Sequence, residues 1–318
     1  MGMLVDGIWQ HEDLAEFARD GSRVRFDSGF HDQIRADGST AFRPEPGRYA
    51  LYCNWTCPWS HRALLTRAQK GLGEVIDLVL LEPAMGKESW WFGQTGRYAD
   101  PALGATHLHT LYSASDPAFT GRVSIPVLWD KPMRRIVNND SGAIARMFNN
   151  EFNALAEHPE RDFYPLALRA EIDTLNAFVA DRLNDGVYRC LLAEDQAQYE
   201  AGFDRVFGAL DELEARLEHR RYLLGERPTE PDWRLFACLV RFDAVYYPLY
   251  KCNLRRIVDY PNLWAYTRDL YQQPAVAATV NLAAIKAGYY GMLGRGGVVP
   301  KGPLLDFTTT HGRDVRFA

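Results

Sequence analysis

The spacing of hydrophobic positions changes near residue 48 and again near residue 150. Apolar runs at 48–52 and 75–81 flank an apolar-periodic segment at 58–72, which predicts a strand, a helix and a strand. Because a helix of this length joins the two strands, we expect them to be parallel, as in a βαβ unit. Residues 1–46 are polar and rich in turn-forming residues instead, and we expect an extension wrapped over the surface.

Two more apolar runs, 122–130 and 135–138, are spaced like the strands of a hairpin. Pro126 lies inside the first run and would interrupt a central strand. A cis Ile125–Pro126 bond, in a loop before the strand where a ligand backbone pairs, accounts for it. The preceding connection, 82–121, lacks periodicity but is rich in aromatic residues, which favours a functional loop.

Residues beyond 150 show only helical periodicity. The predicted helices are 166–183, 196–216, 231–245, 263–271 and 277–290. Thr229 and Asp232 are spaced as a capping box, so we interpret them as folding signals rather than catalytic residues. The expected domain order is an extension (1–46), an α/β domain (47–150), an all-helical domain (151–293) and a tail rich in glycine and proline (294–318).

Composition narrows the classes of partner. The chain has 318 residues, 47% hydrophobic and 24% charged, as in soluble globular proteins of two domains. A net charge of -5 without a basic stripe argues against nucleic acid, and no apolar run is long enough for a membrane span. The first residues do not resemble a secretory signal, so we expect a cytoplasmic protein. Five scattered cysteines match neither a disulfide framework nor a metal-ligand pattern, so we expect no metal.

Cys57 carries the clearest chemical signal. It lies between the strand at 48–52 and the helix beginning at Pro58, and proline is favoured at the first helical position. The thiol is therefore near the free amides and the positive end of the helix, an environment that favours a nucleophilic thiolate. A buried, inert cysteine is the alternative. Cys53 is four residues earlier rather than three, so we expect monothiol chemistry, with an external thiol resolving any mixed disulfide.

A second helix start, near 139–145, carries Asp140 and Ser141 in its capping region. Free amides at such an end attract a carboxylate, and Asp140 could hold an ammonium group. Both groups occur at one end of a γ-glutamyl moiety. Plain helix capping is the alternative explanation for both residues.

Several sequence blocks, in this order, resemble the glutathionyl-hydroquinone reductases, the Xi class of glutathione transferases. The resemblance covers about 47–312 and implies a glutathione transferase fold, with an α/β thioredoxin-like N-terminal domain and an all-α C-terminal domain. The blocks are Cys57-Pro58-Trp59, His61-Arg62, Gly121-Arg122-Val123, Ile125 to Asp130, Asn138 to Ser141, Asp232 to Phe236, Val240 to Asp243, and Tyr260 to Leu263.

This resemblance implies glutathione-dependent reduction of S-glutathionyl-hydroquinones through a mixed disulfide of Cys57, with release of oxidised glutathione. Cys57 would be the nucleophile, and Tyr188 would exchange the proton at the aromatic carbon. Tyr246 and Tyr289 would donate hydrogen bonds to the thiolate. A homodimer is expected by resemblance alone. The implied glutathione-binding residues are Trp90, Arg122, Val123, Ser124, Ile125, Pro126, Asp140 and Ser141.

The chain departs from the family pattern at several positions. Asp140 replaces the usual glutamate, and Gly288, Met292 and Leu293 replace histidine and serine-histidine positions around the paired tyrosines. These changes bear on the quinol specificity rather than on the thiol chemistry. Two other hypotheses differ in what they require. An Omega-like thioltransferase or lyase would not need Tyr188 and Tyr289, and a non-catalytic binding domain would not need an activated Cys57.

Overall fold

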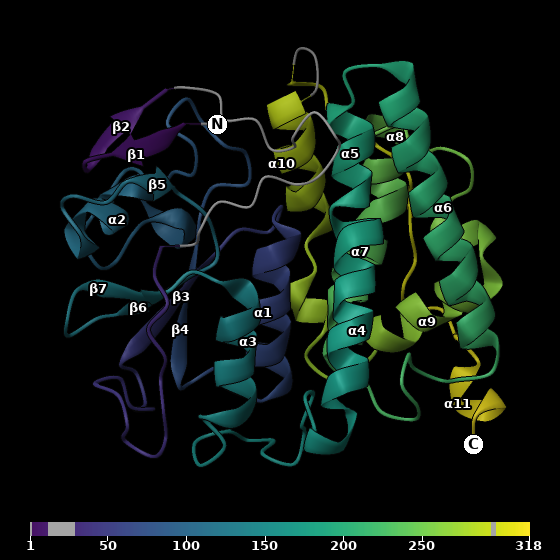
Figure 1. The fold of residues 1–318 in the computed structure, drawn as a ribbon, viewed down its shortest axis with the longest axis horizontal. Helices are drawn as coiled ribbons and strands as arrows, with labels where there is room; N and C mark the ends of the chain where they lie inside the picture. Colours follow the sequence, from purple (N-terminus) through teal and green to yellow (C-terminus); the bar gives the residue numbers. More distant parts are fainter. Residues whose placement is uncertain (1, 12–28, 294–296) are drawn as a thin grey trace. The chain divides into compact units, whose positions relative to one another are not determined.

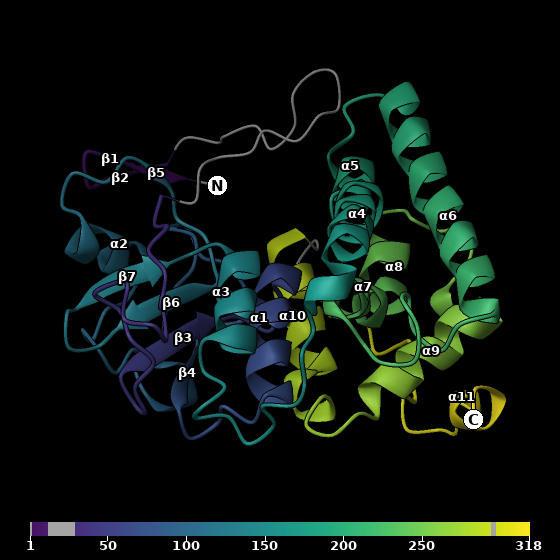
Figure 2. The ribbon, with the colours of Figure 1, turned by 60° about the horizontal axis from the view of Figure 1, so that its bottom comes forward.

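The computed structural model describes residues 2–11, 29–293 and 297–318 of the chain (Figures 1 and 2). These residues divide into two compact units. The first unit holds 2–11, 29–161 and 283–292, and the second holds 162–282, 293 and 297–318. Parts of the expected extension (12–28) and tail (294–296) lie outside the described residues.

The first unit is built on a mixed sheet with the strand order β4-β3-β6-β7. Its strands are β3 (Tyr49–Cys53), β4 (Ile76–Leu80), β6 (Val127–Asp130) and β7 (Arg135–Asn138). β3 and β4 are parallel, as the connecting helix α1 (Pro58–Gln69) requires, and β6 and β7 form an antiparallel hairpin. The predicted βαβ unit and hairpin are therefore confirmed.

Helices cover both faces of this sheet (Figures 1 and 2). α1 packs against α3 (Ser141–Asn150) on one face, and α2 (His109–Ser115) packs against β7 on the other. Every residue of β3 is buried, as expected for a strand covered on both faces. α2 lies in the connection that shows no periodicity in the sequence, because 7 residues are too few to display a helical repeat.

The N-terminal residues contribute strands of their own. β1 (Met3–Val5) and β2 (Ile8–Gln10) form an antiparallel hairpin, and β1 also pairs with β5 (Gly121–Arg122). The hairpin turn uses Asp6 and Gly7, both with positive φ. No strands were predicted here, since strands of 3 residues are too short to show alternation.

The second unit is helical. Two π-helical segments, Ala180–Asn184 and Phe242–Tyr246, precede α5 and follow α7. Four of the predicted helices are present as α4, α6, α7 and α9, whereas α5 was not predicted. The helices are α4 (Arg169–Val179), α5 (Gly186–Leu192), α6 (Gln196–Glu218), α7 (Glu230–Arg241), α8 (Tyr247–Leu249), α9 (Pro261–Tyr271) and α11 (Arg313–Arg316).

The fifth predicted helix is α10 (Leu282–Leu293), whose residues 283–292 pack with the first unit. Helical periodicity placed it in the all-helical region of the sequence, but periodicity does not show what a helix packs against. None of the helices in the described ranges has the length and hydrophobicity needed to cross a bilayer.

The capping box at the start of α7 is confirmed. The buried carboxylate of Asp232 accepts hydrogen bonds from the Thr229 amide (2.7 Å) and the Thr229 hydroxyl (2.8 Å). It also accepts from the amide of Leu223 (2.9 Å) and the hydroxyl of Tyr266 (2.7 Å). Four donors on one carboxylate explain how a charged residue is accommodated in the core.

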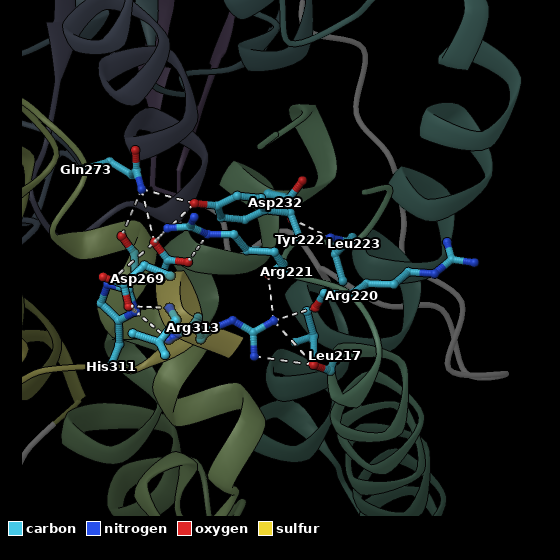
Figure 3. Close-up of polar contacts among 12 residues, drawn as sticks. Leu217, Arg220, Arg221, Tyr222, Leu223, Asp232, Asp269, Gln273, His311 and Arg313 are labelled. Atoms are coloured by element: carbon cyan, nitrogen blue, oxygen red, sulfur yellow. Dashed lines mark hydrogen bonds and ion pairs between the residues drawn. The ribbon is translucent and has the colours of Figure 1, made fainter. Parts of the chain in front are cut away.

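Arg313 ties the C-terminal helix α11 to the rest of the second unit (Figure 3). Its buried guanidinium donates to the backbone carbonyls of Leu217 (3.3 Å), Arg220 (2.5 Å) and Arg221 (2.6 Å). Beside it, the carboxylate of Asp269 forms an ion pair with Arg221, with an N–O distance of 2.9 Å. Helix α11 therefore belongs to the fold of this unit.

Candidate active site

Cys57 is the N-cap residue of α1, with Pro58 in the first turn of the helix. Its backbone is extended (φ -76°, ψ 117°), as N-cap residues require. The Sγ atom accepts a hydrogen bond from the amide of Ser60 at 3.4 Å and lies 3.8 Å from the carbonyl oxygen of Ile125. The strand-to-helix position predicted for this cysteine is confirmed, and a helix-terminal amide points at its sulfur.

The turn before Cys57 is fixed to the end of β4. The side chain of Asn54 accepts from the amide of Thr56 (2.7 Å) and donates to the carbonyl of Glu82 (2.5 Å). The hydroxyl of Thr56 donates to the carbonyl of Pro83 (2.8 Å). These bonds set the position of the thiol relative to the sheet. Neither residue was predicted to act in the site, although an asparagine two residues before a threonine is a recognisable turn signal.

Cys53 differs from Cys57 in its surroundings. It lies in the buried strand β3, and burial raises the pKa of its thiol well above the usual value. None of the five cysteines, all of which lie within the described ranges, forms a disulfide. A thiol that stays protonated is a poor resolving partner, which is consistent with the monothiol chemistry expected from the spacing.

The segment 122–126 passes beside the sulfur of Cys57. The Ile125–Pro126 peptide bond is cis, as predicted, and β6 begins directly after it at Val127. The missing amide of Pro126 therefore falls before the strand and costs the sheet no hydrogen bond. Val123 and Ile125 are buried, whereas Arg122 and Ser124 are partly exposed.

A buried tyrosine holds this segment from behind. Tyr112 donates its hydroxyl to the carbonyl of Ser124 (2.7 Å) and accepts from the amide of Ser124 (3.1 Å) and from Asn139 Nδ2 (2.8 Å). Burial raises the pKa of the Tyr112 phenol, so the group stays neutral and able to donate. This role of Tyr112 was not predicted from the sequence, because the three residues are brought together only by the fold.

The start of α3 matches the capping explanation. Asp140 is the N-cap residue, and its side chain accepts from the amide of Ala143 at 2.7 Å. Asp140 is exposed, whereas Ser141 is buried and its hydroxyl accepts a hydrogen bond from the guanidinium of Arg62. Contact of either residue with a γ-glutamyl group stays a prediction.

Trp90 is buried in the core of the first unit, within the connection 82–121. Its carbonyl accepts a hydrogen bond from the amide of Leu108 at 2.9 Å, and it follows Ser89, which has a positive φ of 65°. Its backbone is therefore held close to the start of α2. Its packing on glutathione stays a prediction.

The predicted catalytic tyrosines fall in both units. In the second unit, Tyr188 and Tyr246 have ring centroids 6.3 Å apart, and Tyr250 lies 5.2 Å from Tyr188 and 5.1 Å from Tyr246. Tyr188 follows one π-helical segment, and Tyr246 ends the other, a geometry frequent at functional sites. Tyr250 is a neighbour of both rings that was not predicted from the sequence. Tyr289 lies in α10 of the first unit and is buried.

Comparison with known proteins places this arrangement in a family. The model of the glutathione S-transferase N-terminal domain matches residues 56–151, and that of the C-terminal domain matches 196–269. Glutathionyl-hydroquinone reductase PcpF of Sphingobium chlorophenolicum is 45% identical over 95% of this chain and 96% of its own length. Glutathionyl-hydroquinone reductase YqjG of Escherichia coli is 40% identical over the full length of both chains. The chain belongs to the glutathionyl-hydroquinone reductase family.

Solved structures of this family agree with the fold. The glutathione-bound structure of YqjG superposes with a TM-score of 0.89 at 39% identity, covering 99% of this chain and 100% of the other. An Xi-class glutathione transferase from Natrialba magadii gives a TM-score of 0.91 at 38% identity, covering 99% and 97% of the two chains. The expected glutathione transferase fold, with its α/β N-terminal and helical C-terminal parts, is therefore confirmed.

Proposed function

We propose that this protein reduces S-glutathionyl-hydroquinones to free hydroquinones, using glutathione as the reducing co-substrate. The observation that carries the proposal is the position of Cys57 at the N-cap of α1, with an amide on its sulfur and the cis-proline segment beside it. Two relatives that cover nearly the whole chain are named for this activity. No step of the proposed reaction requires a metal ion.

In the first half-reaction the Cys57 thiolate attacks the sulfur of the glutathionyl group. A bond forms between the two sulfur atoms, and the carbon–sulfur bond to the aromatic ring breaks. The electron pair of that bond passes to the ring carbon, which takes a proton from the phenol of Tyr188. The hydroquinone leaves, and Cys57 remains as a mixed disulfide with glutathione.

In the second half-reaction a glutathione thiolate attacks the glutathione sulfur of this mixed disulfide. Oxidised glutathione leaves, and the Cys57 thiolate is restored. The proton that the attacking glutathione loses returns the Tyr188 phenolate to a phenol. The resolving thiol comes from solution, because Cys53 is buried and its pKa is raised. Tyr246 and Tyr289 are proposed to donate hydrogen bonds to the thiolate of Cys57 and so to favour its charged form.

Glutathione is proposed to bind along 122–126, with Trp90 packing on the tripeptide and with Asp140 and Ser141 at its γ-glutamyl end. The backbone amide and carbonyl of Ser124 are already bonded to Tyr112. Backbone pairing with glutathione is therefore assigned to Ile125, beside the cis Pro126. The proposed assembly is a homodimer in the cytoplasm, which gel filtration with light scattering and fractionation of cells would test.

The test is release of hydroquinone from a glutathionyl-benzohydroquinone in the presence of glutathione. We expect turnover by the wild type, none by Cys57→Ala, and full turnover by the matched control Cys53→Ala. Tyr188→Phe should slow formation of the mixed disulfide and release of hydroquinone to the same extent, because both follow from cleavage of the carbon–sulfur bond.

No turnover by the wild type, with glutathione still bound, would refute the hydroquinone assignment. Turnover of disulfide substrates by the same preparation would then support the Omega-like thioltransferase. Loss of every thiol-dependent activity would support a non-catalytic binding domain.

A further inference from the structure

A cluster of metal-ligating side chains lies in the first unit, apart from the residues assigned to catalysis. Glu88, His107 and His109 are each partly exposed, and one ligand atom from each lies within 4.8 Å of the others. His109 Nε2 is 2.9 Å from Glu88 Oε2, and His107 Nδ1 is 3.8 Å from the same oxygen. Two imidazoles thus converge on one carboxylate. This cluster was not predicted from the sequence, where only the cysteines were weighed as metal ligands.

Aromatic stacking holds the two imidazoles in place. The rings of His107 and His109 are nearly parallel, with centroids 5.3 Å apart and an interplanar angle of 10°. Trp9 stacks on His109 with centroids 5.0 Å apart and an angle of 23°. Trp9 belongs to β2, which is fixed by its pairing with β1. This packing restricts the side-chain rotamers, so the ligands lose little conformational freedom when a metal binds.

Backbone pairing joins the two segments that supply the ligands. Glu88 lies in a tight turn in which Gly86 and Ser89 exchange backbone hydrogen bonds of 2.8 and 3.2 Å. Trp91 forms a β-bridge with His107, directly beside this turn. The turn therefore positions Glu88, and the β-bridge positions the segment that carries the two histidines.

The charge of the cluster suits a cation. The Glu88 carboxylate supplies a negative charge, and both histidine nitrogens that face it can act as neutral imidazole ligands. The hydroxyl oxygen of Thr106 lies 3.0 Å from His107 Nδ1, and a bound metal would replace this contact.

We propose that Glu88, His107 and His109 form a site for a divalent transition-metal ion, with zinc as the expected ion. Two imidazole nitrogens and one carboxylate oxygen are a known zinc donor set, in which water completes the coordination. Magnesium and calcium prefer sites made of oxygen ligands only. Ligands about 2.0–2.2 Å from zinc lie about 3.4 Å apart in a tetrahedron. Side-chain shifts of about 1 Å therefore convert the observed cluster into a bound site.

Zinc at this site would cross-link the turn containing Glu88 to the start of α2. Trp90 follows this turn in the chain, and its carbonyl accepts a hydrogen bond from the amide of Leu108, just before α2. Bound zinc would therefore fix the loop that carries a proposed glutathione contact. This consequence for glutathione rests on the proposed function, whereas metal binding itself does not.

The test is isothermal titration of zinc chloride into untagged, full-length Cys57→Ser protein, without added thiols. The serine removes the one thiol proposed to be reactive, so binding reports on this cluster. We expect one zinc ion per chain. His107→Ala, His109→Ala and Glu88→Gln should each weaken binding by about 100-fold or more, since loss of a mere outer-shell partner already costs 10–100-fold.

His158→Ala is the matched control. His158 is also partly exposed beside a glutamate, with Nδ1 3.4 Å from Glu160 Oε1. Within the described ranges, however, this pair does not belong to a group of three potential ligands. The variant should therefore bind zinc as tightly as the parent protein. Thermal unfolding without zinc verifies that each variant is folded, and zinc should raise the melting temperature of the parent and of His158→Ala only.

Absence of binding, or equal affinity of the parent and all three ligand variants, would overturn the proposal. The three ligand variants are independent, so failure of one to fold leaves the test intact. A failed hydroquinone assay would not affect this result, because zinc binding is measured without substrate and without the Cys57 thiol.

Discussion

Gly288 lets α10 lie directly against the turn that precedes Cys57. A Cβ atom at this position would lie 1.9 Å from Thr56 Oγ1 and 2.5 Å from the carbonyl oxygen of Pro83. Approaches below 3.0 Å are essentially never observed for Cβ atoms. The Thr56 hydroxyl can rotate away, but the Pro83 carbonyl is backbone. Gly288→Ala must therefore displace α10 or the turn by about 0.5 Å.

The cost of Gly288→Ala follows from three effects. Overpacking costs about 1–3 kcal/mol. Rotation of Thr56 loses its 2.8 Å bond to Pro83, a further cost of about 1 kcal/mol. Alanine gains about 1 kcal/mol of helix propensity over glycine. The net loss of unfolding free energy is about 2 kcal/mol, which lowers the melting temperature by about 3 °C in a protein of 318 residues.

Turnover should fall as well, because α10 carries Tyr289 in the next position. A shift of about 0.5 Å is expected to lower kcat for hydroquinone release by about tenfold, with a smaller effect on KM for glutathione. Thermal unfolding is measured by calorimetry, and kcat and KM are measured by steady-state kinetics. The double variant Gly288→Ala/Thr56→Ala should recover only part of the loss, because the clash with Pro83 remains.

Gly208→Ala is the matched control. Gly208 is an exposed position in α6 with nothing within 4 Å of an added Cβ, so the same substitution should raise stability by up to about 1 kcal/mol. A melting temperature and kcat for Gly288→Ala equal to those of the wild type would refute the close packing of α10 on the turn. Any side chain larger than that of alanine would meet the same backbone carbonyl at this position.

Three further predictions concern single groups. Burial raises the pKa of Asp243 to about 6, so the folded state binds this proton more tightly than the unfolded state and loses stability as pH rises from about 4 to 6. In urea unfolding, the free energy of unfolding of Asp243→Asn should rise by up to about 3 kcal/mol relative to that of the wild type as the pH increases across that range. Parallel pH profiles of the unfolding free energy of the two proteins would contradict this. Arg313→Met should lower the unfolding free energy by about 3 kcal/mol, because it leaves three carbonyls without their charged donor. Arg316 is exposed, so the control Arg316→Met should lower the unfolding free energy by about 1 kcal/mol or less. Equal effects of the two substitutions would contradict the burial argument. Alkylation by iodoacetamide in the native state should modify Cys57 but not Cys53, as mass spectrometry of the peptides would show, and comparable labelling would contradict the raised pKa of Cys53.

Local signals in the sequence determined the elements on which the site is built. Proline after Cys57 marked a helix start, Pro126 inside an apolar run marked a cis bond, and Thr229 with Asp232 marked a capping box. Each signal involves residues close together in the chain, so it can be recognised without knowledge of the fold. The family blocks could be recognised for the same reason, and they led to the correct fold.

Only the tertiary structure decided which distant residues meet. Nothing in the sequence pairs Tyr112 with Ser124 and Asn139, or assigns α10 to the unit that contains Cys57. The convergence of His107 and His109 on Glu88 is likewise a product of folding, since 19 residues or more separate the carboxylate from the imidazoles. The physical reason is that caps and periodicity depend on neighbouring residues, whereas packing and long-range hydrogen bonds depend on the geometry of the whole chain.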